Sequence, residues 1–182
     1  MASNSMNELK QKNYLILGGT SGIGFSLAKK LSKDSLVSVI GRDPSKVEKE
    51  NNKNIICYQH EIRDFEITSN FLESKIDQNK FDGIFISVGI ERFKRLGAIK
   101  KQDFDEIFLP PISSLLAVLK LSANGKLLNQ NSSIVVMSSV SSVRGKSSMS
   151  LYGSSRAAIE SLVIHSSNEL AKRKIRVNAI RA

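Results

Sequence analysis

Short apolar runs alternate with longer stretches of helical period along the chain. The short runs, which are typical of strands, span residues 14–17, 36–40, 55–58, 83–88, 133–137 and 175–180. Between them, apolar residues recur at helical spacing over residues 23–31, 64–78, 104–128 and 151–173, and Pro44 marks a further helix start. Because central strands of a parallel sheet are buried on both faces, they should be apolar throughout, as these are. The alternation predicts a doubly wound, three-layer α/β/α sheet of the Rossmann-like class.

Local signals refine these helices and their connections. Asp64 is expected to cap the helix that follows it, because its carboxylate can accept from free amides of the first turn. Pro110 and Pro111 are expected to break or bend a long helix, since proline lacks an amide hydrogen. The serine-rich segment 132–155 begins with a strand and ends in a helix, so we expect an ordered crossing rather than a flexible loop.

Length and composition place the chain among ordinary globular domains. It has 182 residues, of which 41% are hydrophobic and 24% charged, and we expect one domain over residues 1–182 with 1–12 flexible. The single cysteine, Cys57, cannot form an intramolecular disulfide, which fits a reducing compartment. The polar N-terminal segment lacks the apolar stretch of a secretory signal, and no apolar run approaches the length of a membrane span. These features indicate a cytoplasmic protein without a membrane partner.

The net charge of +10 raises the question of nucleic acid. The basic residues are spread along the chain, with small groups at 92–95 and 172–176, and no zinc-ligand set or aromatic RNA-binding strand accompanies them. We therefore expect no nucleic-acid partner, and binding through the basic surface stays as a weaker alternative. The same field would attract an anionic small ligand. His60 and His165 have no ligand-spaced partners, so no metal site is expected.

A glycine-rich loop joins the first predicted strand to the first predicted helix. Its spacing is G-x-x-x-G-x-G, so it differs from the G-x-G-x-x-G of the standard dinucleotide fingerprint. Glycines let the backbone turn sharply beside a phosphate, and the helix N-terminus offers free N–H groups to it. A tight turn without a ligand is the alternative. The residues expected to hold a pyrophosphate are Gly18, Thr20, Ser21, Gly22, Ile23 and Gly24.

This loop resembles the T-G-x-x-x-G-I-G cofactor loop of the short-chain dehydrogenases/reductases, with Leu17 in place of the threonine. Further segments are similar to family motifs, in the family's order and spacing. They are Ser87-Val88-Gly89 at N-A-G, Ser138-Ser139 after the fifth strand, Tyr152 to Arg156 at Y-x-x-x-K, and Arg176-Val177-Asn178-Ala179-Ile180 at R-V-N-x-I. Several ordered motifs are more specific than any one of them. The resemblance implies a single NAD(P)-binding domain.

The end of the second strand bears on the choice of nicotinamide cofactor. An NAD site has an acidic side chain there for the ribose 2′-hydroxyl, whereas this chain has Gly41 followed by Arg42. A guanidinium pairs well with a 2′-phosphate, so NADP(H) is favoured over NAD(H). The alternative is that Asp43 binds the ribose. The resemblance also implies cofactor contacts from further residues: Glu61, Ile62, Ser87, Val88, Gly89, Tyr152 and Arg156.

The family resemblance implies catalysis by Ser139, Tyr152 and Arg156. A tyrosine gives or takes the proton at the substrate oxygen, a serine orients that oxygen, and a lysine one turn later favours the phenolate and holds the ribose. Here Arg156 replaces the lysine, and it stays charged and cannot join a proton relay. Pro111 falls at the position of the family's asparagine, and Ser87 replaces the asparagine of N-A-G.

Two readings follow from these departures. In the first, the chain is an NADP(H)-dependent oxidoreductase acting on a carbonyl or alcohol substrate, such as a 3-oxoacyl or other keto compound. In the second, it binds NADP(H) without turnover and has a regulatory or scaffolding role. The family also forms dimers through two long helices, here 104–128 and 151–173, so we expect a homodimer or homotetramer. The chain stops short of the family's usual seventh strand.

Overall fold

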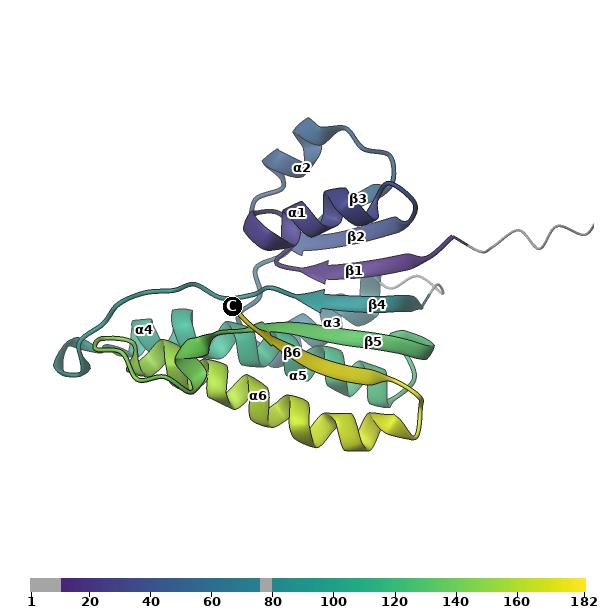
Figure 1. The fold of residues 1–182 in the computed structure, drawn as a ribbon. Helices are drawn as coiled ribbons and strands as arrows, with labels where there is room; N and C mark the ends of the chain where they lie inside the picture. The colour runs from purple at the N-terminus through teal and green to yellow at the C-terminus, as the bar shows by residue number, and fades with distance from the viewer. Residues whose placement is uncertain (1–10, 76–79) are drawn as a thin grey trace, which may run out of the picture.

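The computed structural model describes residues 11–75 and 80–182, which form one sheet flanked by helices (Figure 1). All strand pairs are parallel, and the order is β3-β2-β1-β4-β5-β6. This is the strand order of a doubly wound dinucleotide-binding sheet, as the alternation predicts. The strands are β1 (Asn13–Leu17), β2 (Leu36–Gly41), β3 (Ile55–Gln59), β4 (Phe81–Ile86), β5 (Leu128–Ser138) and β6 (Arg176–Arg181).

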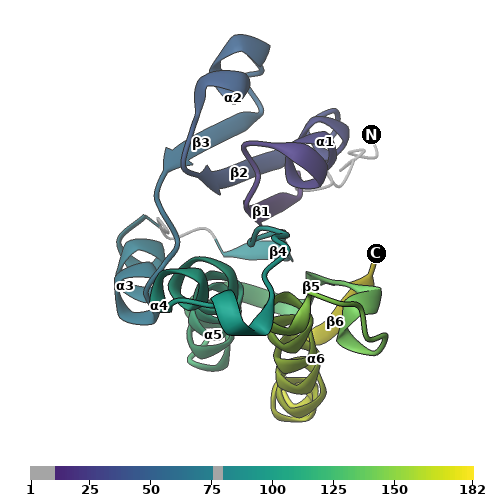
Figure 2. The same ribbon diagram turned by 90° about the vertical axis from the view of Figure 1, so that its left-hand side faces the viewer.

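Helices cover both faces of the sheet, with α1 on one side and α3, α5 and α6 on the other (Figure 2). The longer helices are α1 (Gly22–Leu31), α2 (Ser45–Glu50), α3 (Phe65–Lys75), α5 (Leu109–Ala123) and α6 (Ser150–Ala171). Shorter helical segments are η1 (Leu96–Ala98), α4 (Lys101–Asp103), η2 (Phe104–Phe108) and η3 (Val140–Ser142). The three-layer arrangement is confirmed.

The core divides into two apolar clusters, one on each face of the sheet. The smaller joins β1 and β2 to α1 and α2 through residues such as Ile16, Ala28 and Val39. The larger joins β4, β5 and β6 to α3, α5 and α6 and includes Ile134 and Leu115, both without exposed surface. Burial on both faces explains the apolar sequence of the central strand β1, whereas the edge strand β6 carries Arg176, Asn178 and Arg181 and is largely exposed.

The two prolines do not interrupt the long helix. The residues from Lys101 to Ala123 are continuously helical, and the segment η2, just before Pro110, is a π-helix. A proline removes one amide and its ring clashes with the carbonyl four residues earlier, and a π-turn moves that carbonyl out of register. The predicted break is therefore wrong. The helix continues through both prolines, and the π-helical segment before them accommodates the missing amides by widening the helix locally.

The boundary between α5 and β5 also differs from the prediction. The helix ends at Ala123, not at position 128, and the strand begins at Leu128, not at position 133. Gly125 has a φ of +73°, and the amides of Gly125 and Lys126 return to carbonyls of the last helical turn, as in a Schellman motif. The polar residues 129–131 conceal the start of the strand in the sequence.

The structure also tests the predicted cap of α3 and the predicted bounds of β4. The amides of Glu66 and Ile67 donate to Asp64 Oδ1 at 2.8 and 3.0 Å, so the predicted cap of α3 is confirmed. The strand predicted over residues 83–88 is displaced by two residues: β4 runs from Phe81 to Ile86, so Ser87 and Val88 lie in the following loop. The expected flexibility of residues 1–10 and the predicted end of α3 at Gln78 lie outside the described residues.

One helical stretch, Lys101–Ala123, is long and apolar enough to cross a membrane by length and composition alone. In this structure 61% of its most apolar window is buried inside the protein. The stretch packs against α3 and α6, and its apolar residues Leu115, Val118 and Leu121 belong to the larger core cluster. Packing within the domain accounts for its composition.

Candidate active site

A cavity of about 620 Å³ opens at the carboxyl ends of the strands, where β1 and β4 lie side by side. This is the point at which the strand order reverses, and ligands of doubly wound sheets bind there. The volume is in the range typical of small-molecule sites. Its walls come from four loops and the start of the long helix, namely Gly18, Thr20–Ile23, Gly41, Arg42, His60–Arg63, Ser87–Ile90, Arg92, Asp105, Glu106 and Pro110.

The glycine loop is held in place by close backbone contacts. Gly18 has a φ of +78°, and a Cβ there would lie 2.5 Å from the carbonyl oxygen of Ser87. A Cβ on Gly24 would lie 2.2 Å from the carbonyl oxygen of Gly18. Gly24 does not line the cavity, so its place in the structure is to let α1 approach the loop. Gly22, with a φ of +53°, faces open space.

The first two residues of α1, Gly22 and Ile23, line the cavity. The amides of Gly18 and Gly19 both donate to the carbonyl of Ile40, at 2.8 and 3.1 Å, and so tie the loop to β2. Ser21 precedes the helix and makes no side-chain capping bond, and the first-turn amides of a helix have no partner within it. An open glycine beside an uncapped helix N-terminus fits a diphosphate.

The end of β2 excludes a side chain at the position of the usual acidic residue. A Cβ on Gly41 would lie 2.1 Å from Thr20 Oγ1, and Thr20 itself is buried. The next residue, Arg42, lines the cavity, and its guanidinium makes no ion pair with any residue in 11–75 or 80–182. Asp43 does not line the cavity. It accepts from the hydroxyl and amide of Ser45, which lower its pKa, so it serves the start of α2.

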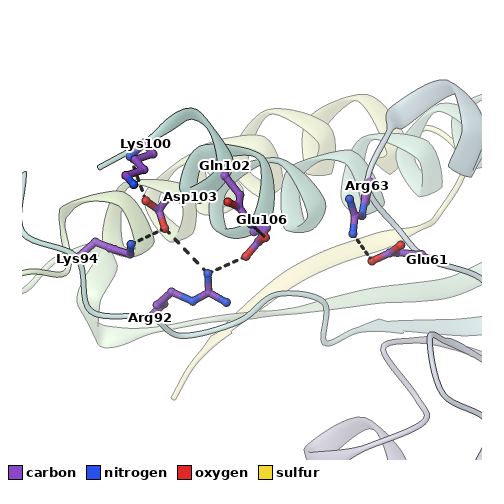
Figure 3. Close-up of polar contacts among 8 residues, drawn as sticks. All are labelled: Glu61, Arg63, Arg92, Lys94, Lys100, Gln102, Asp103 and Glu106. Carbon is purple, nitrogen blue, oxygen red and sulfur yellow. Dashed lines mark hydrogen bonds and ion pairs between the residues drawn. The ribbon is translucent and has the colours of Figure 1, made fainter. Parts of the chain in front are cut away.

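Beyond Arg42 the wall continues with residues that follow β3. Glu61 pairs with Arg63 at 2.8 Å (Figure 3). Ile62, between them in the sequence, is buried and also lines the cavity. His60 stacks on Phe71 of α3, with ring centroids 3.9 Å apart, and burial lowers its pKa. His60 therefore makes a packing contact with α3 and also lies on the cavity wall.

The opposite rim is a network of charged side chains between the loop after β4 and the start of the long helix (Figure 3). Arg92 donates to Glu106 at 2.7 Å, and Lys94 lies 3.0 Å from Asp103. The pKa of Asp103 is lowered, first by the amide of Lys100 and then by Lys94. Gln102 and Arg92 lower the pKa of Glu106 in the same way. The network ties the loop to the π-helical segment.

The three predicted catalytic residues lie on α6 and at the end of β5, and none of them lines the cavity. Ser139 is 8% exposed and precedes η3, where its Oγ accepts from the amide of Ser141 at 3.3 Å. Tyr152 is half-buried in the first turn of α6.

Arg156 connects this group to the cavity wall. It is 5% exposed, and its Nη1 lies 3.3 Å from the carbonyl oxygens of both Val88 and Met137. Its guanidinium carbon stands 4.7 Å from the centre of the Tyr152 ring, an arrangement that attracts a cation to the ring face. A Cβ on Gly89 would lie 2.4 Å from Nη2, so this glycine makes room for the guanidinium.

Sequence reasoning missed several residues of the cavity wall. These are His60, Arg63, Ile90, Arg92, Asp105, Glu106 and Pro110. The available signal was position, because residues just after parallel strands gather at one edge of the sheet. That rule covers the residues that follow β3 and β4. It does not cover those of the long helix, which reach the cavity through the π-helical segment.

Comparison with known proteins assigns the class. The family profile described as short chain dehydrogenase matches residues 12–182. The chain therefore belongs to this family of NAD(P)-dependent oxidoreductases.

Individual relatives agree with this assignment. The chain is 28% identical to carbonyl reductase family member 4 of Xenopus laevis over 169 residues, covering 91% of this chain and 72% of that protein. It is 26% identical to the 3-oxoacyl-(acyl-carrier-protein) reductase FabG of Thermotoga maritima over 188 residues, covering 94% and 73%.

Solved structures share the fold. ElxO with NADP bound superposes with a TM-score of 0.80 at 26% identity, covering 94% of this chain and 73% of that one. A short chain dehydrogenase from Burkholderia cenocepacia in complex with NADP has a TM-score of 0.84 at 23% identity, covering 93% and 73%.

Proposed function

We propose that this chain is an NADP(H)-dependent oxidoreductase that transfers hydride to or from a carbonyl or alcohol carbon. One observation carries the proposal: the cavity brings the glycine loop, Arg42 and the loop after β4 to a single surface at the switch point of the sheet. The nicotinamide cofactor supplies the hydride, and the protein's task is to hold it and to manage one proton.

The side chains divide this work between the two ends of the site. The first turn of α1 would hold the diphosphate, and the residues after β3 would contact the adenine. Ser139 orients the substrate oxygen and Tyr152 exchanges the proton with it. Arg156 lies over the Tyr152 ring and reaches the wall at Val88, so its charge favours the phenolate and its donors suit the ribose.

The preference for NADP(H) rests on the end of β2. The space of a side chain at position 41 is taken by Thr20, and Asp43 is engaged by Ser45, so neither offers a carboxylate to a ribose 2′-hydroxyl. Arg42 lines the cavity instead and can pair with a 2′-phosphate. ElxO and the Burkholderia protein, both described with NADP, are compatible with this preference.

A second candidate is an NADP(H)-binding protein that does not turn over. It is favoured by the absence of Ser139, Tyr152 and Arg156 from the lining of the described cavity. Pro111 removes the side chain expected to anchor a relay water. Under this candidate, the pair of changes Arg156→Lys and Pro111→Asn creates turnover in a chain that otherwise has none.

Titration of nicotinamide fluorescence with NADPH and NADH, followed by a turnover assay on the same sample, tests the proposal. We expect tighter binding of NADPH and oxidation of NADPH with at least one member of a broad panel of carbonyl compounds. Tyr152→Phe should abolish turnover and leave the dissociation constant of NADPH within about twofold. Saturable binding without any turnover would establish the second candidate, and absence of binding would reject both.

We also propose that the chain forms a homodimer or homotetramer and that it is located in the cytoplasm. The outward side of α6 carries Ser154, Ala157, Ser161 and Ile164, and Ile164 is 62% exposed. Small residues beside an exposed isoleucine suit close helix approach. Light scattering should report a dimer or tetramer, and Ile164→Lys should shift it toward monomer.

A further inference from the structure

Glu160 of α6 is the centre of a polar cluster that the proposed reaction does not yet use. Its Oε1 accepts from the hydroxyl of Ser138 at 2.6 Å and lies 2.7 Å from that of Ser142. Arg181 of β6 donates to both carboxylate oxygens, at 2.9 and 2.7 Å. The Glu160 side chain is 15% exposed, whereas that of Arg181 is 51% exposed, so the carboxylate is mostly covered and the arginine is partly open to water.

The cluster surrounds Ser139 on both sides along the chain. Ser138 precedes it on β5 and pairs in register with Arg181 on β6. Ser142 stands at the end of η3. Its hydroxyl oxygen lies 2.8 Å from the carbonyl oxygen of Ser139, and its amide donates to the same oxygen at 3.0 Å. The turn that presents Ser139 is therefore fastened to α6 at one carboxylate, two helical turns beyond Tyr152.

We propose that Glu160 is a positioning residue that fixes Ser139 relative to Tyr152 by holding the Ser138–Ser142 turn and β6 onto α6. The inference rests on the proposed function, because it assigns Ser139 the orientation of the substrate oxygen. Glu160 itself is not part of the cavity wall and touches no reacting atom.

The carboxylate is suited to this task because it stays ionised. Arg181 lowers the pKa of Glu160 to about 2, with further contributions from the hydroxyls of Ser138 and Ser142. A charged acceptor with three donors has a fixed orientation, whereas a glutamine would turn its amide nitrogen toward at least one donor. Glu160→Gln keeps the shape of the side chain and removes this preference.

A double-mutant cycle with Ser139→Ala separates positioning from general support of the fold. We expect Glu160→Gln to lower kcat about tenfold in the otherwise native chain, and by less than about twofold when Ser139 is already alanine. The dissociation constant of NADPH should not change. Ser142→Ala, a milder variant, should give the same pattern at roughly threefold. Glu169→Gln, on the same helix and exposed, is the control and should behave as native.

Equal losses of kcat in both backgrounds, or no loss in the native one, would overturn the inference. If the native chain shows no turnover at all, the proposed function fails, and amide hydrogen exchange then decides the inference by itself. Exchange at residues 141–144, whose amides donate to Ser139 and Val140, should rise about tenfold in Glu160→Gln and not in Glu169→Gln. Unchanged exchange at these residues would refute the proposal that Glu160 holds the Ser138–Ser142 turn onto α6.

Discussion

The glycine loop after β1 and the start of α6 shape the two ends of the site by different means. In the loop, the positions are set by backbone contact, with Cβ-to-oxygen distances of 2.5 and 2.2 Å for hypothetical side chains at Gly18 and Gly24. At α6, they are set by two polar side chains: Arg156 donates to the backbone carbonyls of Val88 and Met137, and Glu160 accepts from Ser138 and Arg181. The first arrangement leaves no room for a side chain at Gly18 or Gly24, whereas the second depends on which polar side chains are present.

This difference can be compared with where the chain departs from its family. The glycine loop keeps the spacing of the family motif, and a Cβ on Gly18 or Gly24 would lie within 2.5 Å of a backbone carbonyl oxygen. The departures that the family resemblance indicates at Pro111 and Arg156 belong to the proposed catalytic end, where Arg156 bonds the backbone carbonyls of Val88 and Met137 and a π-helical segment precedes the prolines. Ser87 lies instead beside Gly18 of the glycine loop. Substitutions at one end test whether the other end responds.

The largest effect is expected from Gly24→Ala. Its Cβ would meet the carbonyl oxygen of Gly18, so α1 must move away from the loop, at a cost of about 1–3 kcal/mol. The shift also removes the first-turn amides from the diphosphate, and NADPH affinity should fall more than about a hundredfold. Gly97→Ala is the control, because nothing lies within 4 Å of its Cβ. Fluorescence titration measures the NADPH affinity of each variant, and urea unfolding measures its stability. Native NADPH affinity in Gly24→Ala would refute the view that backbone contacts shape the glycine loop.

Next in size is Arg156→Met, which perturbs the catalytic end. Methionine fills similar volume without the charge over the Tyr152 ring, so turnover should fall about 10- to 100-fold. Stability should change by less than about 1 kcal/mol, because loss of the bonds to Val88 and Met137 is offset by relief of a buried charge. Steady-state kinetics and urea unfolding report the two quantities. Native kcat in this variant would remove Arg156 from the chemistry.

A smaller effect is expected from Arg42→Ala, which tests the nucleotide end without touching the fold. Loss of a charge-assisted bond to a 2′-phosphate costs about 1.5 kcal/mol, or roughly tenfold in NADPH affinity. NADH lacks that phosphate, so its affinity should stay within about twofold. Lys46→Ala, an exposed basic residue of α2, controls for general charge. Equal weakening of both cofactors would place Arg42 outside the 2′-phosphate site.

The same contrast explains what the sequence could and could not reveal. Gly18, Gly22 and Gly24 could be recognised in the sequence because a site formed by backbone contacts requires glycines at fixed spacing. The central strands could be recognised because they are continuously apolar. Glu160 has no such mark: a glutamate on a long helix is normally solvated, and its partners Ser138 and Arg181 come from separate strands. Side-chain sites of this kind appear only once the tertiary structure brings their members together.

The smallest effect concerns pH and compares a carboxylate from each end. Arg181 lowers the folded-state pKa of Glu160 from its usual 4.5 to about 2, so its stabilising contribution is present above the unfolded pKa and is lost as pH falls from there toward 2. The difference in unfolding free energy between the native chain and Glu160→Gln should therefore be full at pH 6 and shrink steadily in acid. Asp43 also has a lowered pKa, held by Ser45, but it is fully exposed and screened by water, so Asp43→Asn should show a weaker dependence. Urea unfolding between about pH 3 and 6 measures both. The difference in unfolding free energy between the native chain and Glu160→Gln could instead be independent of pH. In that case the charge of Glu160 would contribute nothing to its bonds with Arg181 and the two serines, and only packing would hold the turn onto α6.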